Sequence, residues 1–305
     1  MNKNAAAHLS LFAVNLFYGL NFLIAKGLMP DLVGPSGFIV LRVLCTTVLF
    51  WLLWAAVYRE RITDKKDLWL MAKCAVFGVC ANQILFFNGL NHTSPVNASI
   101  IMVSTPILVL VMAALIQGER ITGIKALGVA LGAGGALALV LMRGGSDNGS
   151  TWYGDLMVLL NGLSYAVYLV MVKPLMVKYK PLTVISYVFL FGLPMVIPFG
   201  WNQFTAIQWS SMTASNVYAI VFVVFCVTFL AYLLNIFALK YVTASVTGVY
   251  IYMQPFVATL LMAAMAKWFG GPPADITWGK LACGIAIFTG VALVSRKSLR
   301  AEVKN

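Results

Sequence analysis

The sequence predicts an all-α integral membrane protein whose ten transmembrane helices form two inverted five-helix repeats. Three observations lead to this fold class: the apolar composition, the presence of ten long apolar stretches, and the similarity of the two halves of the chain. Of the 305 residues, 61% are apolar and 10% are charged, whereas soluble domains carry roughly 25% charged residues. The mean hydropathy is +0.91. We therefore expect one multi-pass membrane domain without an appreciable soluble part.

Ten stretches are long enough to cross a hydrocarbon core of roughly 30 Å as helices that rise about 1.5 Å per residue. We place them at residues 9–28, 36–58, 68–90, 95–117, 122–142, 152–172, 182–200, 215–239, 243–266 and 277–295. Prolines, a charge run and a polar stretch separate most of them. The first stretch is longer than the apolar part of a signal peptide, so we expect it to remain as the first helix.

The two halves of the chain are similar to each other at a nearly constant offset. Tyr18 falls on Tyr165 at an offset of 147 residues, and Pro106 falls on Pro255 at an offset of 149. Each half holds five spans, and five is an odd number. A second copy that starts where the first ends must then enter the membrane from the opposite face, so the repeats are predicted to be inverted.

The predicted boundaries are residues 1–146 for the first repeat and 147–305 for the second. The distribution of lysine and arginine supports the orientation of these repeats. With both termini in the cytoplasm, sixteen of the twenty-one basic residues lie on or next to the cytoplasmic side and about four on the outer side. Short cytoplasmic loops of membrane proteins carry such an excess. We predict a multi-pass protein of the cell inner (plasma) membrane with both termini cytoplasmic.

Several function classes are not expected from this composition. The formal net charge of +12 is explained by loops that contact anionic lipid headgroups, so no nucleic-acid partner is predicted. The five cysteines lie in apolar segments without a CxxC motif or a nearby histidine, which indicates neither a metal site nor a disulfide framework. The sequence shows no paired acids and no nucleophile with its base. We predict no catalytic residues, no metal and no cofactor.

Matched helix interruptions are the best sequence indication of a binding site in an inverted-repeat carrier. Pro106 and Pro255 form such a pair, each near the middle of its predicted span. A proline in a helix displaces the carbonyl four residues earlier, here those of Met102 and Ile251, and these carbonyls can then face a cavity. The alternative is that both prolines only bend their helices to fit their neighbours.

Polar side chains inside predicted spans are costly in hydrocarbon and tend to face a cavity or a partner. The residues that we predict to bind substrate are Asn15, Tyr18, Asn21, Lys26, Arg42, Asn82, Gln83, Tyr165, Tyr168, Tyr232, Asn235 and Gln254. Thr105, Asn161 and Tyr250 are of the same character. Gln83 and Tyr232 are repeat mates at the offset of 149. For any one of these residues the alternative is a hydrogen bond between helices.

Arg42 is the most informative of these residues, because it lies about 10 Å along its helix from the outer end. No carboxylate lies in the core of any predicted span. A substrate carboxylate, a phosphate or a displaced helix carbonyl would therefore balance the guanidinium. Lys26 and Lys173 lie near span ends, where extension of the side chain toward the headgroups is an alternative. Without a buried acid, we expect a uniporter or exchanger, or coupling through groups such as Lys26.

Small residues recur at helical spacing on the last span of each half. They are Gly128, Gly132 and Gly135 in the first half, and Ala282, Ala286 and Gly290 in the second. Such faces permit close approach of two helices. The approach can occur within one bundle or between two copies, so a homodimer is left open.

The stretch NHTSPVNASIIMVSTPILVLVMAALIQGERITGIKALGVALGAGGALALV resembles the EamA-like branch of the drug/metabolite transporter superfamily. Repeats of this family pair a mid-span proline with a Gly-Glu-Arg turn and a glycine-rich fifth helix. FYGLNFLIAK and FIVLRVL look like its opening helices, and the resemblance covers essentially the whole chain. The second half departs from the pattern, since Trp268 stands where Glu119 stands in the first. The resemblance implies ten helices and transport of small metabolites, often amino acids, usually outward.

Taken with the residues, this resemblance predicts a secondary carrier that works by alternating access. Its partners are a small-molecule solute, such as an amino acid or another carboxylate-bearing compound, and the lipid bilayer. We expect export across the plasma membrane. Two alternatives come from other classes: a channel-like facilitator, and a membrane-embedded enzyme that acts on lipid.

Overall fold

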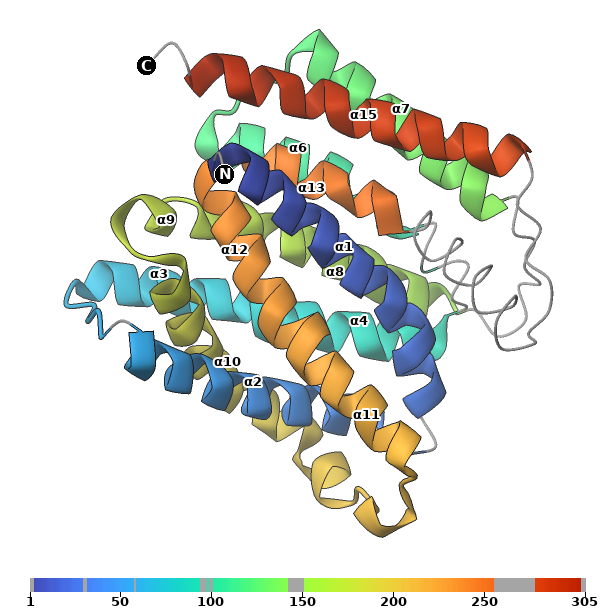
Figure 1. Cartoon of the computed structure of the whole chain (residues 1–305). Coiled ribbons are helices and arrows are strands. Elements are labelled where there is room, and N and C mark those ends of the chain that lie inside the picture. Colours follow the sequence, from blue (N-terminus) through green and yellow to red (C-terminus); the bar gives the residue numbers. More distant parts are fainter. Residues whose placement is uncertain are drawn as a thin grey trace.

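The computed structural model describes residues 3–29, 32–57, 59–93, 98, 101–141, 151–254 and 278–302. Regular secondary structure in these ranges is entirely helical, without a strand, as Figure 1 shows. The prediction of an all-α fold is confirmed. The helices of the first half are α1 (Lys3–Leu28), α2 (Pro35–Val57), α3 (Lys65–Ala75), η1 (Val76–Cys80), α4 (Ala81–His92), α6 (Thr105–Gln117) and α7 (Gly123–Leu141).

The second half is helical in the same way. Its helices are α8 (Trp152–Val172), α9 (Leu175–Lys178), α10 (Pro181–Thr205), η2 (Trp209–Ser211), α11 (Ala214–Phe222), η3 (Val223–Leu230), α12 (Ala231–Tyr241), α13 (Ala244–Val249), η4 (Tyr250–Tyr252) and α15 (Trp278–Glu302). Segments η1 and η3 are π-helical, so α3–η1–α4 and α11–η3–α12 each run as one continuous helix. Segments η2 and η4 are short 3₁₀ turns.

Within the described ranges, five helical stretches are long and apolar enough to cross a membrane. They are Pro35–Val57, Lys65–His92, Trp152–Lys178, Pro181–Thr205 and Ala214–Tyr241. Each overlaps a predicted span. The shorter apolar helices Thr105–Gln117, Gly123–Gly135 and Leu281–Val294 overlap three more. The count of ten remains a prediction, because five of the predicted spans include residues outside the described ranges.

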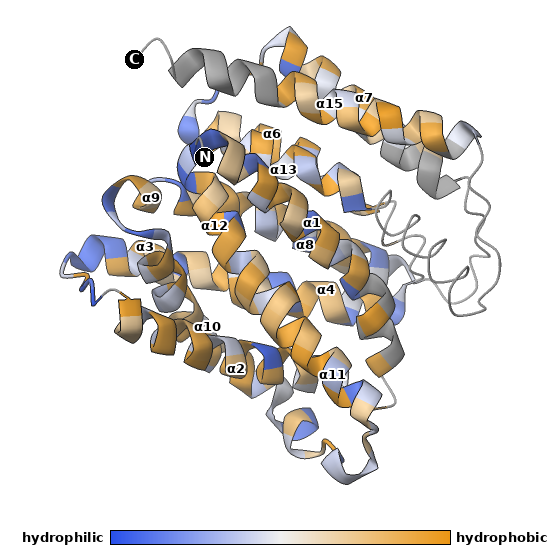
Figure 2. Cartoon of the chain, in the orientation of Figure 1, coloured by the Kyte–Doolittle hydropathy of each residue, from blue (hydrophilic) through white to orange (hydrophobic). Residues whose placement is uncertain are grey.

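Most of the helical ribbon in Figure 2 is orange, the colour of apolar residues, and the outer surface includes many exposed apolar side chains. Leu115 is 73% exposed and Ile285 is 69% exposed, and many other large apolar side chains also point outward. Contiguous apolar surface of this kind is unfavourable in water and favourable in lipid. Hydrophilic residues gather at helix ends and loops. The molecule is therefore a membrane-embedded helix bundle.

Local sequence signals fix where the helices begin and end. The side chains of Thr151, Thr213 and Thr243 accept hydrogen bonds from the first backbone amides of α8, α11 and α13, as capping threonines do. Gly118 ends α6 with a φ of 66°, a left-handed conformation that favours glycine. Glu119 then forms an ion pair with Lys125, which closes the Gly-Glu-Arg turn onto the start of α7.

Helices α7 and α15 lie side by side along one edge of the bundle (Figure 1). Five of the six small residues predicted to permit close approach meet at this interface, namely Gly128, Gly132, Gly135, Ala286 and Gly290, whereas Ala282 is exposed. A Cβ atom added to Gly135 would lie 2.9 Å from the carbonyl oxygen of Cys283, and one added to Gly128 would lie 2.8 Å from that of Gly290. These residues therefore allow α7 to pack on α15 within one chain. A homodimer stays a prediction.

Candidate functional site

A cavity opens among the helices of both halves. It contains about 730 Å³ of unoccupied space, counting the part open to the surroundings. Helices α1, α2, α4, α8 and α12 contribute to its lining, together with the segments around η3 and η4. The lining residues are Tyr18, Asn21, Arg42, Asn82, Gln83, Phe86, Phe87, Met102, Thr105, Asn161, Tyr165, Val227, Tyr232, Ile251 and Gln254.

Eight of the predicted site residues line this cavity. They are Tyr18, Asn21, Arg42, Asn82, Gln83, Tyr165, Tyr232 and Gln254. Two further predicted residues lie directly behind the lining. The Gln254 side-chain amide donates to Asn15 Oδ1 at 2.9 Å, and the Asn235 amide donates to the Tyr165 hydroxyl. Asn15 and Asn235 are therefore placed to orient the lining residues Gln254 and Tyr165 rather than to face the cavity.

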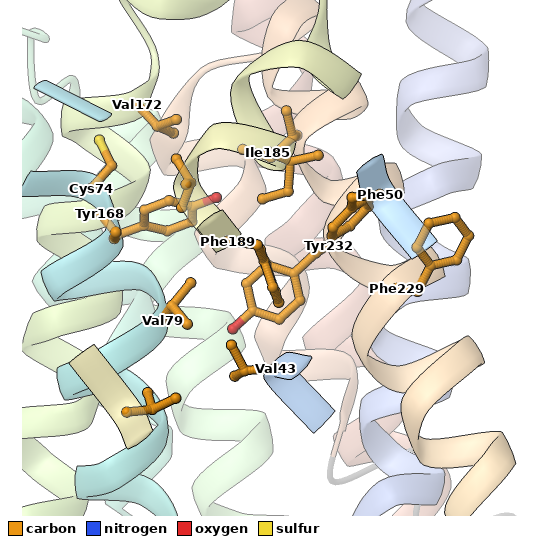
Figure 3. Close-up of a cluster of buried hydrophobic side chains, with 14 of the residues drawn as sticks. Val43, Phe50, Cys74, Val79, Tyr168, Val172, Ile185, Phe189, Phe229 and Tyr232 are labelled. Carbon is orange, nitrogen blue, oxygen red and sulfur yellow. The ribbon is translucent and has the colours of Figure 1, made fainter. Parts of the chain in front are cut away.

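The remaining predicted residues lie elsewhere. Tyr168 packs in the apolar core beside Cys74, Val79 and Val172, as Figure 3 shows, and is 1% exposed. The side chain of Lys26 and the whole of Pro255 fall outside the part that the structure describes. Lys173, which was considered beside Lys26, donates to the backbone carbonyls at the end of α12 and so neutralises that helix terminus.

Arg42 lies deep in the bundle and is 4% exposed. Its Nε donates to the Thr228 hydroxyl at 2.9 Å. The guanidinium carbon lies 4.9 Å from the Phe87 ring centre and 5.6 Å from that of Phe38, within the range of cation–π attraction. Its Nη1 has no hydrogen-bond partner among the described residues. No described carboxylate lines the cavity, so the charge of Arg42 is not balanced by an acid there.

Thr228 holds Arg42 because η3 is a π-helix. The Thr228 hydroxyl donates to the carbonyl of Val223, five residues earlier, at 2.9 Å. The hydroxyl oxygen is then oriented to accept the Arg42 hydrogen bond. Wide π-helical turns of this kind are frequent at functional sites. The side chain of Thr228 is fully buried.

The π-helix η1 of the first half provides a second link between the two halves of the chain. The Tyr232 hydroxyl on α12 donates to the backbone carbonyl of Gly78 at 3.1 Å. Ser164 on α8 donates to the neighbouring carbonyl of Phe77 at 2.7 Å. Figure 3 shows the Tyr232 ring against Phe189, with ring centres 5.0 Å apart. The carbonyls of η1 thus position helices of the second half next to the cavity.

A helix break precedes Pro106. Residues 103–104 form a turn, after which α6 begins at Thr105, with the proline at the helix start. The Ser104 hydroxyl donates to the Ile101 carbonyl at 2.6 Å. The Ile101 carbonyl oxygen, which the helix break frees, therefore has a hydrogen-bond partner within the turn. In the second half the 3₁₀ turn η4 ends three residues before Pro255. Met102 and Ile251, whose carbonyls were predicted to be displaced, both line the cavity.

Sequence reasoning missed the apolar part of the lining. Phe86 and Phe87 follow Gln83 at three and four residues on α4, so they share its helix face. Helical spacing from Gln83 would have found them. Val227 adjoins Thr228 in a π-helix, and no sequence signal marked that segment. The cavity therefore combines one cation and several amides and phenols with aromatic and aliphatic walls.

Two ion pairs of the described chain, Glu119 with Lys125 and Asp67 with Lys178, involve residues that do not line the cavity. Asp67 at the start of α3 accepts two hydrogen bonds from Lys178 at 2.9 and 3.0 Å and one from the Tyr179 hydroxyl at 2.8 Å. The hydrogen bond to Asp67 raises the pKa of Tyr179 to about 12, so the phenol keeps its proton. Within the described ranges no group of three His, Cys, Asp or Glu residues could hold a metal.

Comparison with known proteins gives a consistent result. YetK of Bacillus subtilis, an uncharacterized transporter, is 24% identical over 270 residues, which cover 88% of this chain and 82% of YetK. A protein of Streptantibioticus cattleyicolor named probable terminal-alkyne amino-acid exporter is 28% identical over 238 residues, which cover 77% of this chain and 75% of that protein. One crystal structure matches with a TM-score of 0.75 at 17% identity, over 97% of this chain and 99% of the other.

The crystal structure supports the fold alone, because its sequence identity is low. The profile of the EamA-like transporter family matches residues 5–141 and 152–296, which is most of the chain. Relatives that match across most of the chain are named as transporters. The protein belongs to the EamA-like transporter family and is a membrane transporter, not an enzyme.

Proposed function

We propose that this transporter is a secondary carrier that exports carboxylate-bearing small metabolites, amino acids in particular, across the plasma membrane. The observation that supports this substrate class is Arg42. It is a buried guanidinium on a cavity, with one nitrogen unpartnered and no carboxylate beside it among the described residues. A desolvated guanidinium binds a carboxylate through two parallel hydrogen bonds. The exporter name of the Streptantibioticus relative supports both the substrate class and the direction.

Many secondary carriers achieve alternating access with two structurally related halves, and three observations support such a repeat. The family profile matches two successive stretches, close to the predicted boundaries at 146 and 147. Segment η1 falls within η3 at the offset of 149. Helix α2 packs on its mate α10, and α7 packs on its mate α15. Helix α4 packs on α8, and their repeat mates α12 and α1 pack on each other. A two-fold relation of the halves requires this equivalence.

With five spans per half, these halves would be inverted, with the cavity between them and both termini in the cytoplasm. The cavity lining comes from both halves, which is where inverted-repeat carriers bind substrate. Motion of one half against the other would open the cavity to each side in turn. Contacts between halves at helix ends, such as Asp67 with Lys178, would then form and break during the cycle.

A counterflow experiment tests this proposal. Purified protein is reconstituted into liposomes loaded with an unlabelled amino acid, and uptake of the same labelled amino acid is followed from outside. A carrier gives transient accumulation above the equilibrium level, because the internal substrate drives exchange. Flux without this overshoot would favour the channel-like alternative. If no labelled amino acid enters faster than into protein-free liposomes, the proposed substrate class is wrong.

Thr228→Val is expected to raise the KM for amino-acid exchange about tenfold with little change in maximal rate, since a hydrogen bond to a charged group contributes about 1.5–3 kcal/mol. Thr228 positions Arg42 through its hydroxyl, and valine keeps the shape without that hydroxyl. Thr228→Ser retains the hydroxyl and should restore most of the affinity. The measurement is the initial rate of exchange against substrate concentration.

Thr46→Val is the matched control for this prediction. Thr46 is also fully buried, lies one turn beyond Arg42 on α2, and has a hydroxyl without a partner in the described chain. Its replacement should leave the KM unchanged. An equal rise in KM for Thr46→Val and Thr228→Val would show a general packing effect and contradict the positioning role of Thr228.

A further inference from the structure

Three neutral polar side chains on the cavity, those of Asn21, Gln83 and Thr105, resemble Arg42 in having an unpartnered atom. Asn21 is 7% exposed and Thr105 is 2% exposed. The Asn21 Oδ1 and the Thr105 Oγ1 have no hydrogen-bond partner in the described chain, and both residues line the cavity. A buried oxygen that accepts no hydrogen bond is unfavourable. These atoms are therefore placed to accept hydrogen bonds from a bound molecule.

Two other asparagines at or behind the lining, Asn15 and Asn161, are already engaged, whereas the Gln83 amide on α4 is also without a partner in the described chain. Asn15 donates to the Leu11 carbonyl at 2.7 Å and accepts from Gln254 at 2.9 Å. Asn161 donates to the Asn82 carbonyl at 2.7 Å. An asparagine amide can turn about its terminal bond and present its oxygen to a donor. Asn21 thus offers an uncommitted carbonyl-type oxygen at the cavity.

Asn21 and Arg42 line the same cavity, so a molecule bound there can contact both. Tyr18 on α1 lines this cavity as well. Asn21 follows Tyr18 by three residues on α1, which places it on the same helix face about one turn, or roughly 5 Å, further along. In an α-amino acid, the ammonium group and the carboxylate group are bonded to the same carbon atom. The acceptor and the guanidinium therefore suit the two ends of one zwitterion.

The charge pattern of the cavity restricts the class of zwitterion. Arg42 supplies a full positive charge, but the described lining holds no carboxylate. Neutral oxygens and aromatic rings can hold one ammonium group next to a bound carboxylate. They cannot balance a second cation. The walls formed by Phe86, Phe87 and Val227 suit an apolar side chain.

We propose that Asn21, assisted by Thr105, binds the α-ammonium group of a neutral amino acid with an apolar side chain while Arg42 binds its carboxylate. This inference rests on the proposed function, which needs only the carboxylate end. It adds that the carrier selects α-amino acids over carboxylates that lack the amino group. It also makes Asn21 the residue that determines this selection.

Binding of three related compounds separates the two ends of the site. The compounds are L-leucine, 4-methylpentanoate, which lacks the amino group, and 3-methylbutylamine, which lacks the carboxylate. Isothermal titration calorimetry on the full-length protein in detergent measures each affinity without interference from diffusion across a bilayer. For wild type we expect leucine to bind about tenfold or more tightly than 4-methylpentanoate, since a hydrogen bond to a charged group is lost. The amine should not bind.

Asn21→Leu is expected to weaken leucine binding to the level of 4-methylpentanoate while leaving the affinity for 4-methylpentanoate unchanged. Asn88→Leu is the matched control, because Asn88 bonds to its own helix at Ile84 and does not line the cavity. It should keep the preference for leucine. Thr105→Val should reduce the preference about threefold, and it provides an independent test if Asn21→Leu does not fold.

Different outcomes overturn different statements. Wild-type binding of leucine and 4-methylpentanoate with equal affinity would overturn the role of Asn21 and leave a carboxylate carrier standing. An equal loss of both ligands in Asn21→Leu would show a structural role for Asn21 and also overturn the inference. Failure of wild type to bind either ligand would reject the proposed substrate class itself.

Discussion

Replacing Arg42 by methionine is expected to reduce exchange of carboxylate-bearing solutes at least about a hundredfold, because removing one partner of a buried ion pair costs about 3–5 kcal/mol. Methionine keeps much of the side-chain volume between Phe38 and Phe87 and removes only the charge and its hydrogen bonds. Counterflow in proteoliposomes at matched protein content is the measurement. Arg42→Lys should recover a small part of the activity, since lysine keeps the charge but cannot form the paired hydrogen bonds.

The same substitution is expected to leave the thermal stability of the substrate-free protein unchanged or to raise it. A buried charge without an acidic partner is unfavourable in the empty cavity, so its loss should not unfold the bundle. Lys73→Met is the control, because it removes an exposed cation that packs on Trp69, away from the cavity. If a folded Arg42→Met protein exchanges substrate at the wild-type rate, Arg42 does not bind substrate and has only a structural role.

Gly290→Ala is expected to lower the stability of the protein strongly. A Cβ atom at Gly290 would lie 2.5 Å from the Gly128 carbonyl oxygen and 2.7 Å from the Gly132 amide nitrogen. Both are backbone atoms, which cannot move aside as a flexible side chain does. Overpacking typically costs about 1–3 kcal/mol, and we expect the upper end here. The melting temperature in detergent and the yield of monodisperse protein are the measurements.

Gly134→Ala on α7, the other helix of this interface, is the control for this prediction. An added Cβ there meets nothing within 4 Å, and alanine is a better helix former than glycine by up to about 1 kcal/mol. The variant should be as stable as wild type or more so. Equal behaviour of Gly290→Ala and Gly134→Ala would show that α7 and α15 are not held by close backbone packing.

Much of the candidate site could be predicted from sequence, since a polar group inside an apolar span carries an energetic cost wherever the helix lies. That cost identified Arg42, Gln83 and Tyr232, and all three line the cavity. It could not distinguish Asn21 from Asn15. Both are asparagines on α1, but only the packing of Gln254 against Asn15 satisfies one of them and leaves the other with an unpartnered oxygen.

The sequence by itself determined the all-helical membrane class, the family resemblance, and the depth of the isolated arginine, because these follow from composition, span length and the absence of acids. Only the tertiary structure decided that Tyr168 packs in the core, that Thr228 holds Arg42, and that α7 packs on α15. Each of these three contacts depends on which face of one helix packs against which face of its neighbour. Contacts between residues far apart in the chain set these faces, and periodicity within one helix carries no information about its neighbours.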